Sequence, residues 1–247
     1  MQYLRAAIQF ITILPGGKTP AYYPREMIAY FPAVGLILGL ILAAFDAVAL
    51  QLWAGGFVAA ILDVILLILL TGALHVDGLA DSADGLFGHR DRETVLSIMK
   101  DSRIGVMGMA AVVCALSVKF AGISAIPAQA SFQRFLILLL VPGFARSAMI
   151  FGIHWLPYGR PGGGTGFDLF ENPITIKDYW GLGVCLLLCL FLGWRGIWMV
   201  FAFFGLVIGI LVYYRRRMGC ITGDMLGAMT EVTESMLFLA AAIGVMP

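Results

Sequence analysis

The sequence carries very little charge for its length. Only 13% of its 247 residues are Asp, Glu, Lys or Arg, and 61% are hydrophobic, whereas an ordinary soluble domain has about 25% charged residues. This composition excludes a soluble globular protein. The apolar runs are long and do not alternate with period two, so we expect helices rather than a closed barrel to satisfy the backbone inside lipid. We predict an all-α, polytopic membrane bundle.

Cysteine is scarce, and the sequence also lacks any feature that would divide the chain. Of four cysteines, three lie inside apolar runs, so we find neither a disulfide framework nor a metal-binding cysteine pair. No fixed-period repeat, low-complexity tract or linker is present. We therefore expect one integral-membrane domain over residues 1–247.

The first 30 residues lack the ordered basic, apolar and small-residue regions of a cleaved signal peptide. Instead, polar residues recur every three or four positions from Gln2 to Thr12 in an otherwise apolar segment. This spacing is typical of a helix in the membrane interface, although a helix packed on the bundle would have the same pattern.

Seven apolar segments are candidates for membrane spans. They lie near residues 31–53, 57–74, 104–126, 132–155, 179–194, 196–214 and 225–246. The fifth and sixth are short and closely joined, so a re-entrant hairpin is an alternative for residues 179–214. If the spans alternate, nearly all Lys and Arg residues outside them fall on one side, and Arg195 is the exception. The positive-inside rule then places the N-terminus and the long loops in the cytoplasm, with the chain in the inner (cytoplasmic) membrane.

A cluster of acids follows the second apolar segment. If residues 77–84 are helical, Asp77, Asp81 and Asp84 share one face at positions i, i+4 and i+7. Carboxylates so close together repel one another unless a cation lies among them. Because all three are hard oxygen ligands, we expect Mg²⁺. His75 lies one helical turn before the cluster.

Two further polar blocks indicate anion binding. The first comprises Lys100, Asp101, Ser102 and Arg103 at the start of the third apolar segment, where cations and free N–H groups suit a phosphate; a simple membrane anchor is the alternative. The second runs from Tyr158 through Arg160 and the following glycines, including Gly164, up to Gly166. A glycine-rich backbone can approach an anion closely, but this block lacks the features of a P-loop and would also suit a flexible loop.

The last block extends from Gly219 to Glu234, at the start of the last apolar segment. Asp224, Glu231 and Glu234 lie on or beside one helical face, and Thr222 precedes them. Burying a carboxylate at membrane depth costs about 2.5 to 3.5 kcal/mol. We therefore expect these acids to have a function, although capping of polar partners on a neighbouring helix is an alternative.

Three cations lie inside apolar segments. Arg146 should face a wet or paired interior, and we expect a ligand cavity there rather than a purely structural salt bridge. Lys119 should snorkel or pair with a neighbour. Arg134 is expected to anchor its helix at the membrane interface.

Together, the four blocks resemble the cobalamin 5'-phosphate synthase family, the adenosylcobinamide-GDP ribazoletransferases. The resemblance covers most of the chain, and four blocks in order are far more specific than any one of them. Their residues are His75-x-Asp77-Gly78-x-x-Asp81-x-x-Asp84-Gly85, Lys100 to Gly105, Tyr158-x-Arg160 with the following glycines, and Thr222-Gly223-Asp224-x-x-Gly227-Ala228-x-x-Glu231-x-x-Glu234.

The resemblance implies an enzyme that uses Mg²⁺ and joins adenosylcobinamide-GDP to α-ribazole or its 5'-phosphate. The product would be adenosylcobalamin or its 5'-phosphate, with release of GMP. Membrane lipid would be a further partner and nucleic acid would not, while a homo-oligomer is left open.

The chemistry implied by the resemblance assigns expected roles to the blocks. Metal ions and cationic side chains would neutralise two phosphates while a carboxylate accepts the proton of the attacking hydroxyl. The metal ligands would be Asp77, Asp81 and Asp84, and the proton acceptor Asp84 or Asp81, with His75 orienting a ligand or substrate. Whether Asp224, Glu231 and Glu234 complete the metal site or bind the nucleoside is left open. The expected substrate- and phosphate-binding residues are Lys100, Asp101, Ser102, Arg103, Arg146, Tyr158, Arg160, Gly164 and Thr222.

Two other functions fit parts of the pattern. A CDP-alcohol phosphotransferase also uses aspartates at the membrane edge, but its signature Asp-x-x-Asp-Gly-x-x-Ala-Arg is not matched by the spacing of Asp77, Asp81 and Asp84-Gly85. An ion or metal transporter would place ionisable groups near the bilayer midplane and would show repeats. Here most charges gather at one face.

Overall fold

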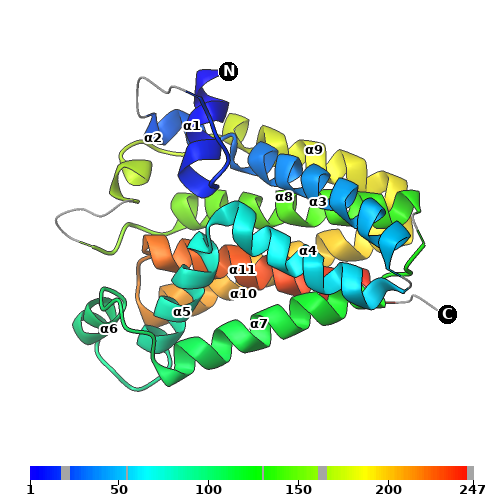
Figure 1. Ribbon diagram of the computed structural model, residues 1–247. Helices are drawn as coiled ribbons and strands as arrows, with labels where there is room; N and C mark the ends of the chain where they lie inside the picture. Colours follow the sequence, from blue (N-terminus) through cyan, green and yellow to red (C-terminus); the bar gives the residue numbers. More distant parts are fainter. Residues whose placement is uncertain (18–22, 54, 130, 161–165, 244–247) are drawn as a thin grey trace.

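The computed structural model describes residues 1–17, 23–53, 55–129, 131–160 and 166–243, and these residues form helices and connecting segments without a named strand. Figure 1 shows the long helices side by side in a bundle, with the short helices of residues 2–28 and 92–98 at one end. The helices are α1 (Gln2–Ile11), α2 (Pro24–Ile28), α3 (Phe31–Leu52), α4 (Gly56–Thr71), α5 (Leu74–Leu86), α6 (Arg92–Ile98), α7 (Val106–Ala125), α8 (Phe132–Trp155), the 3₁₀ turns η1 (Phe167–Phe170) and η2 (Ile176–Tyr179), α9 (Trp180–Cys189), the 3₁₀ turn η3 (Leu190–Leu192), α10 (Trp194–Arg217) and α11 (Gly223–Ala241).

Each predicted span coincides with a helix. However, fewer than seven described helices are long and apolar enough to be candidate membrane spans. Four described helices, α3, α7, α8 and α10, are long and apolar enough to cross a membrane, and the bent pair α4 and α5 makes a fifth if it counts as one span. The predicted count of seven, and the interfacial position of α1, are not confirmed. Helix α9 does not pass this test of length, because even with η3 it covers only residues 180–192.

The second predicted span ends early because the chain breaks between α4 and α5. Gly72 ends α4 in the left-handed conformation with φ of 58°, and Ala73 follows with φ of 60°. A left-handed glycine is a common helix terminator, whereas alanine rarely adopts positive φ. The two helices meet at 90°, so α5 leaves the direction of the span. The break thus turns the segment that bears the acids across the end of the bundle.

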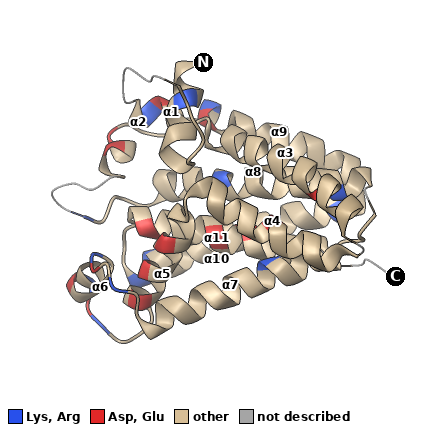
Figure 2. Cartoon of the chain, in the orientation of Figure 1, with Lys and Arg blue, Asp and Glu red and all other residues tan. Residues whose placement is uncertain are grey.

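Helix α11 forms the centre of the bundle. It packs against α5, α7, α8 and α10 and is buried along most of its length. On the other side of α8, α3 runs along it in the closest helix pair of the fold. Figure 2 shows the charged residues concentrated at the end that carries α1, α2, α5 and α6, while the apolar helix flanks are nearly free of charge. The fold therefore brings the predicted polar blocks to one end of an apolar bundle.

Candidate active site

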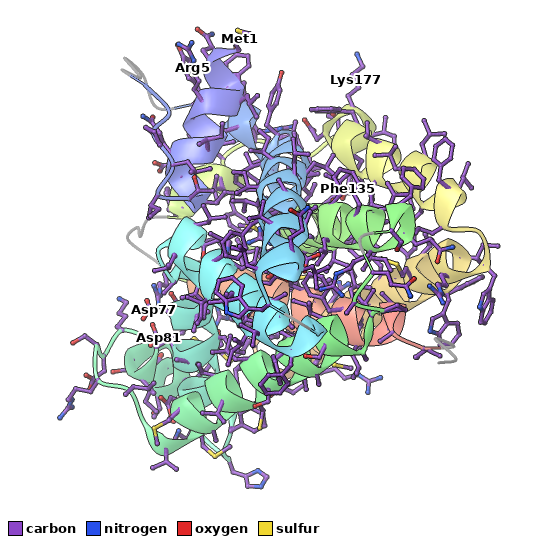
Figure 3. All side chains as sticks on the ribbon, turned by 45° about the vertical axis from the view of Figure 1, so that its right-hand side comes forward. Met1, Arg5, Asp77, Asp81, Phe135 and Lys177 are labelled. Carbon is purple, nitrogen blue, oxygen red and sulfur yellow. The ribbon has the colours of Figure 1, made fainter. Side chains whose placement is uncertain are left out.

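Helix α5 presents two unpaired carboxylates at the charged end of the bundle. Asp77 is exposed and Asp81 is half-buried, and in Figure 3 both project from the same side of α5. Neither forms a hydrogen bond or ion pair with its side chain within the described part of the chain. Their spacing of four residues places them one turn apart, as the sequence predicted. These two oxygen-donor groups are therefore available to a ligand.

The third aspartate of α5 is already engaged. Both carboxylate oxygens of Asp84 accept backbone hydrogen bonds from α7, one from the N–H of Gly105 at 2.6 Å and one from the N–H of Gly108 at 2.8 Å. A Cβ on either glycine would collide with this carboxylate, so the absence of side chains there makes room for it. The negative charge also suits the positive end of the α7 dipole. Asp84 thus ties α5 to the start of α7.

The N-terminus of α11 packs directly against α5. The Thr222 side chain accepts a hydrogen bond from the N–H of Met225 and caps α11, which fixes Asp224 in the first turn. A Cβ on Gly78 would lie 2.7 Å from the Asp224 carbonyl oxygen and 3.1 Å from its Cα. Only glycine at position 78 permits α5 and α11 to approach each other so closely. This close packing brings Asp224 within electrostatic range of Asp77 and Asp81.

The chain around Arg160 joins three of the polar blocks. Tyr158 pairs with Ile221 in an isolated bridge, in which the Gly159 N–H donates to the Ile221 carbonyl at 2.9 Å. This pairing directs Arg160 to the carboxylate of Asp224 and, at 3.2 Å, to the carbonyl oxygen of Met99. Burial raises the pKa of the Tyr158 phenol, so it remains a hydrogen-bond donor at neutral pH. Segments around residues 99, 160 and 224 therefore meet in one place.

A cationic pocket adjoins this junction. Its volume is about 520 Å³, and its lining includes Arg92, Lys100 and Arg160, with Glu93 as the acid. Lys100 was among the predicted phosphate-binding residues, but Arg92 was not. It stands at the first position of α6, and nothing in the spacing of the sequence signals that α6 folds back over the Arg160 segment. Three cations around one pocket suit a polyanionic ligand.

The rest of the second block lies at the surface. Arg103 and Asp101 form an ion pair at 2.6 Å, with their side chains 86% and 39% exposed. The hydrogen bonds from Arg103 lower the pKa of Asp101 to about 2, so the acid is ionised at neutral pH. Ser102 is exposed between them. Gly164 lies outside the described residues.

His75 points to the interior side of α5. It is 1% exposed, and neither ring nitrogen has a hydrogen-bond partner among the described residues. It lines a small cavity of about 80 Å³ together with Asp77, Asp224 and Gly227. Buried polar groups are almost always hydrogen-bonded in folded proteins, so His75 retains capacity for a water molecule or a ligand.

Four charged side chains form a buried charge cluster deeper in the bundle: Lys119, Arg146, Glu231 and Glu234. Lys119 donates to both glutamates, and Arg146 donates to Glu234. All four are at most 4% exposed. The pairing predicted for Lys119 is confirmed. We expected Arg146 to face a ligand cavity, but its terminal nitrogen is bound to Glu234, while its Nε has no partner in the described residues.

Arg134 differs from its prediction. Instead of anchoring α8 at the membrane interface, it is 1% exposed and forms two hydrogen bonds with the carboxylate of Asp46, at 2.6 and 2.7 Å. The sequence places Arg134 close to the start of α8, but it cannot show that Asp46 on α3 lies opposite.

The structure thus brings part of the predicted set together and separates the rest. Asp77, Asp81, Asp224 and Arg160 interact electrostatically. In contrast, Arg146, Glu231 and Glu234 belong to the buried charge cluster, and Asp101, Ser102 and Arg103 lie at the surface. Among the described residues, no group of three or more His, Cys, Asp or Glu side chains is arranged to hold a metal ion.

Comparison with known proteins gives the family of this chain. The family model described as cobalamin-5-phosphate synthase matches residues 3–242, nearly the whole sequence. The chain belongs to the cobalamin-5-phosphate synthase family. Curated relatives named adenosylcobinamide-GDP ribazoletransferase agree: one from Pseudomonas putida is 39% identical over 96% of this chain and 97% of its own length. Another, from Syntrophobacter fumaroxidans, is 36% identical with 96% coverage of both chains.

A third relative of the same name, from Rhizobium meliloti, is 35% identical over 87% of this chain and 84% of its own length. No solved structure matches. The resemblance stated from the four polar blocks is therefore confirmed at the level of the cobalamin-5-phosphate synthase family. The matched range includes every described residue of the candidate site.

Proposed function

We propose that this chain joins GDP-activated adenosylcobinamide to α-ribazole or α-ribazole 5'-phosphate and releases GMP. The names of its relatives support this reaction. The observation on which the proposal depends is the junction at the charged end of the bundle. There, two aspartates of α5 that have no partner in the described part of the chain adjoin a pocket lined by three cations. Such an arrangement suits a substrate that combines a diphosphate with a hydroxyl nucleophile.

In this reaction, a ribose hydroxyl attacks the corrinoid-side phosphorus of the diphosphate. A new P–O bond forms, the P–O bond to the bridging oxygen breaks, and GMP leaves with that oxygen. We assign the diphosphate and GMP to the pocket of Arg92, Lys100 and Arg160, because guanidinium and ammonium groups bind phosphate oxygens through charge-assisted hydrogen bonds.

We assign the proton of the attacking hydroxyl to Asp81. Its carboxylate has no partner among the described residues, whereas both oxygens of Asp84 already accept hydrogen bonds from α7. Asp84 then acts as a positioning residue, because it fixes the orientation of α5. The ring nitrogens of His75, which have no partner in the described ranges, are suited to orient a substrate group or a water molecule in the small cavity beside Asp77.

Magnesium is the cofactor we propose, with Asp77 and one oxygen of Asp81 as its protein ligands, so that the second oxygen of Asp81 can accept the proton. The donor set fits: Mg²⁺ is usually held by one or two carboxylates together with substrate phosphates and water, rather than by an all-protein cage. The metal would neutralise charge on the diphosphate. Asp224 is a further candidate ligand, although Arg160 engages it here. Glu231 and Glu234 are less suited, because Lys119 and Arg146 already neutralise them.

We further propose that the chain crosses the inner membrane seven times, with α1 in the interface and the site facing the cytoplasm. The support is the concentration of Lys and Arg at the end of the bundle that carries the site (Figure 2). The four helices that pass the length and composition test, with α4, α9 and α11, would supply the spans.

The test is turnover by two conservative variants, Asp77→Asn and Asp81→Asn, measured as GMP release from adenosylcobinamide-GDP and α-ribazole. Loss of a metal ligand removes several kcal/mol of transition-state stabilisation, so each variant should lose at least about 100-fold in rate. Stability should change little, because neither side chain has a described partner.

Asp91→Asn is the matched control. Asp91 caps α6 close to the site through the N–H of Thr94, and asparagine caps helices as well as aspartate does, so turnover should be unchanged. Near-normal turnover by Asp81→Asn with Mg²⁺ would refute its role.

A further inference from the structure

An apolar groove lies on the opposite face of α5 from the aspartates. Its volume is about 530 Å³. Helices α7 and α10 form its walls through small residues such as Ala111 and Gly209, and α5 and α11 form its floor. Along α11 it extends from Ala228 to Met236, which is about 12 Å at the usual helical rise. It therefore runs lengthwise between two of the candidate membrane spans.

Two buried hydroxyl groups in this groove lack partners. Ser82 on α5 and Ser235 on α11 both line it, each is 2% exposed, and neither hydroxyl has a hydrogen-bond partner among the described residues. An unpaired polar group in an apolar environment is costly. The groove thus suits an occupant that is mainly apolar but carries hydrogen-bond acceptors.

The charge at one end of the groove indicates the rest of that occupant. Three consecutive arginines, residues 215–217, end α10. Arg216 lies three residues after Tyr213 and seven after Gly209, so it shares the face of α10 on which these two residues line the groove. It is exposed and forms no ion pair with any described residue. Arg217 reaches across to the carbonyls of Gly88 and Arg90, at 2.9 and 3.0 Å.

We propose that this groove binds an anionic phospholipid. One acyl chain lies in the groove, an ester carbonyl accepts from the Ser82 hydroxyl, and the phosphate binds Arg216. A second copy of the chain fits less well, because a two-fold axis along the membrane normal would bring two sets of three arginines together. The lipid packs against α5 from behind and so supports the helix that carries Asp77 and Asp81.

The direct test is native mass spectrometry of the full chain in non-ionic detergent, with equal phosphatidylglycerol and phosphatidylcholine. We expect one phosphatidylglycerol to be retained with about tenfold preference, the size of one charge-assisted contact. Gly209→Leu should abolish retention, and Arg216→Gln should remove the preference. A Cβ at Gly209 has no neighbour within 4 Å, so this variant should fold.

Gly183→Leu and Arg195→Gln are the controls, because Gly183 is equally open and lies on α9, while Arg195 lies at the other end of α10. Both should bind like the parent. Equal retention of the two lipids, or unchanged retention by Gly209→Leu, would overturn the proposal. A dimer that Gly209→Leu dissociates, without bound lipid, would assign the groove to a second copy instead.

A cysteine in the groove provides a second readout without any mutation. Cys114 lines the groove and is exposed, whereas Cys185, Cys189 and Cys220 are buried. Maleimide labelling of Cys114 should slow when phosphatidylglycerol is added and should not slow with phosphatidylcholine. Equal labelling rates with both lipids would contradict the proposal. Neither readout depends on the proposed reaction.

Discussion

Replacement of Gly78 by alanine tests whether the contact between α5 and α11 sets the geometry of the site. The added methyl carbon would lie 2.7 Å from the Asp224 carbonyl oxygen and 3.1 Å from its Cα. Both atoms belong to the backbone of α11, so no side chain can rotate away. The two helices must separate by several tenths of an ångström or more.

The effects on stability and on activity should differ in size. Overpacking costs about 1 to 3 kcal/mol, but alanine favours a helix over glycine by about 1 kcal/mol, so the net loss of stability should stay below about 2 kcal/mol. A displacement of about 1 Å in a reacting group reduces turnover about 100-fold. We therefore expect a folded protein with little activity.

The assay is GMP release by detergent-purified protein, alongside thermal unfolding. Gly183→Ala on α9 is the control, because a Cβ there has no neighbour within 4 Å; it should be slightly stabilised and fully active. Turnover by Gly78→Ala close to that of the parent would show that the approach of α5 to Asp224 does not position the reacting groups.

Other predictions concern the contacts that hold the site in place. Lys119→Met should destabilise the fold by about 3 to 5 kcal/mol, measured by thermal unfolding, because Glu231 then has no ion-pair partner among the described residues, while Arg146 still pairs with Glu234. Partial recovery by Lys119→Met with Glu231→Gln is expected, and an unchanged melting temperature of the single variant would contradict the cluster. Burial opposes but does not outweigh the hydrogen bonds from Arg25 and Thr175, so the pKa of Asp178 lies below its ordinary value. The contribution of ionised Asp178 to folding stability is therefore present above about pH 4 and is lost as the pH falls through the lowered pKa. Asp178→Asn should reduce the loss of stability between pH 6 and pH 2.5. An identical pH profile of stability in the variant and the parent would count against the ion pair of Arg25 and Asp178. Asp84→Ala should lower turnover and also the melting temperature, since two N–H groups of α7 lose their acceptor, whereas loss of turnover alone would assign Asp84 directly to the chemistry.

The helices and the active end of the molecule were largely predictable from sequence. Long apolar runs have few alternatives to helix inside a membrane, and the i, i+4 spacing of Asp77 and Asp81 gave their common face. The four polar blocks gave the family. These features can be read from short segments of the sequence or from the order of the motifs along it.

The partners of individual charges were not predictable, because they depend on which helices are neighbours. The sequence offers no sign that Asp84 meets the start of α7, or that Glu231 and Glu234 meet Lys119 and Arg146. The bend between α4 and α5 was missed as well, because the apolar residues continue through Gly72 and Ala73 although the helix is broken there. The sequence therefore predicted which helix face carries the acids. It could not predict which of these acids remain available to a ligand.

The most direct test of the central claim is a structure of the full chain with adenosylcobinamide-GDP and Mn²⁺ in place of Mg²⁺, with the metal located by its anomalous signal. The account predicts metal density bound to the carboxylates of Asp77 and Asp81, with the diphosphate between them and the pocket of Lys100 and Arg160. Metal density at Glu231 and Glu234, or a diphosphate bound away from α5, would contradict it.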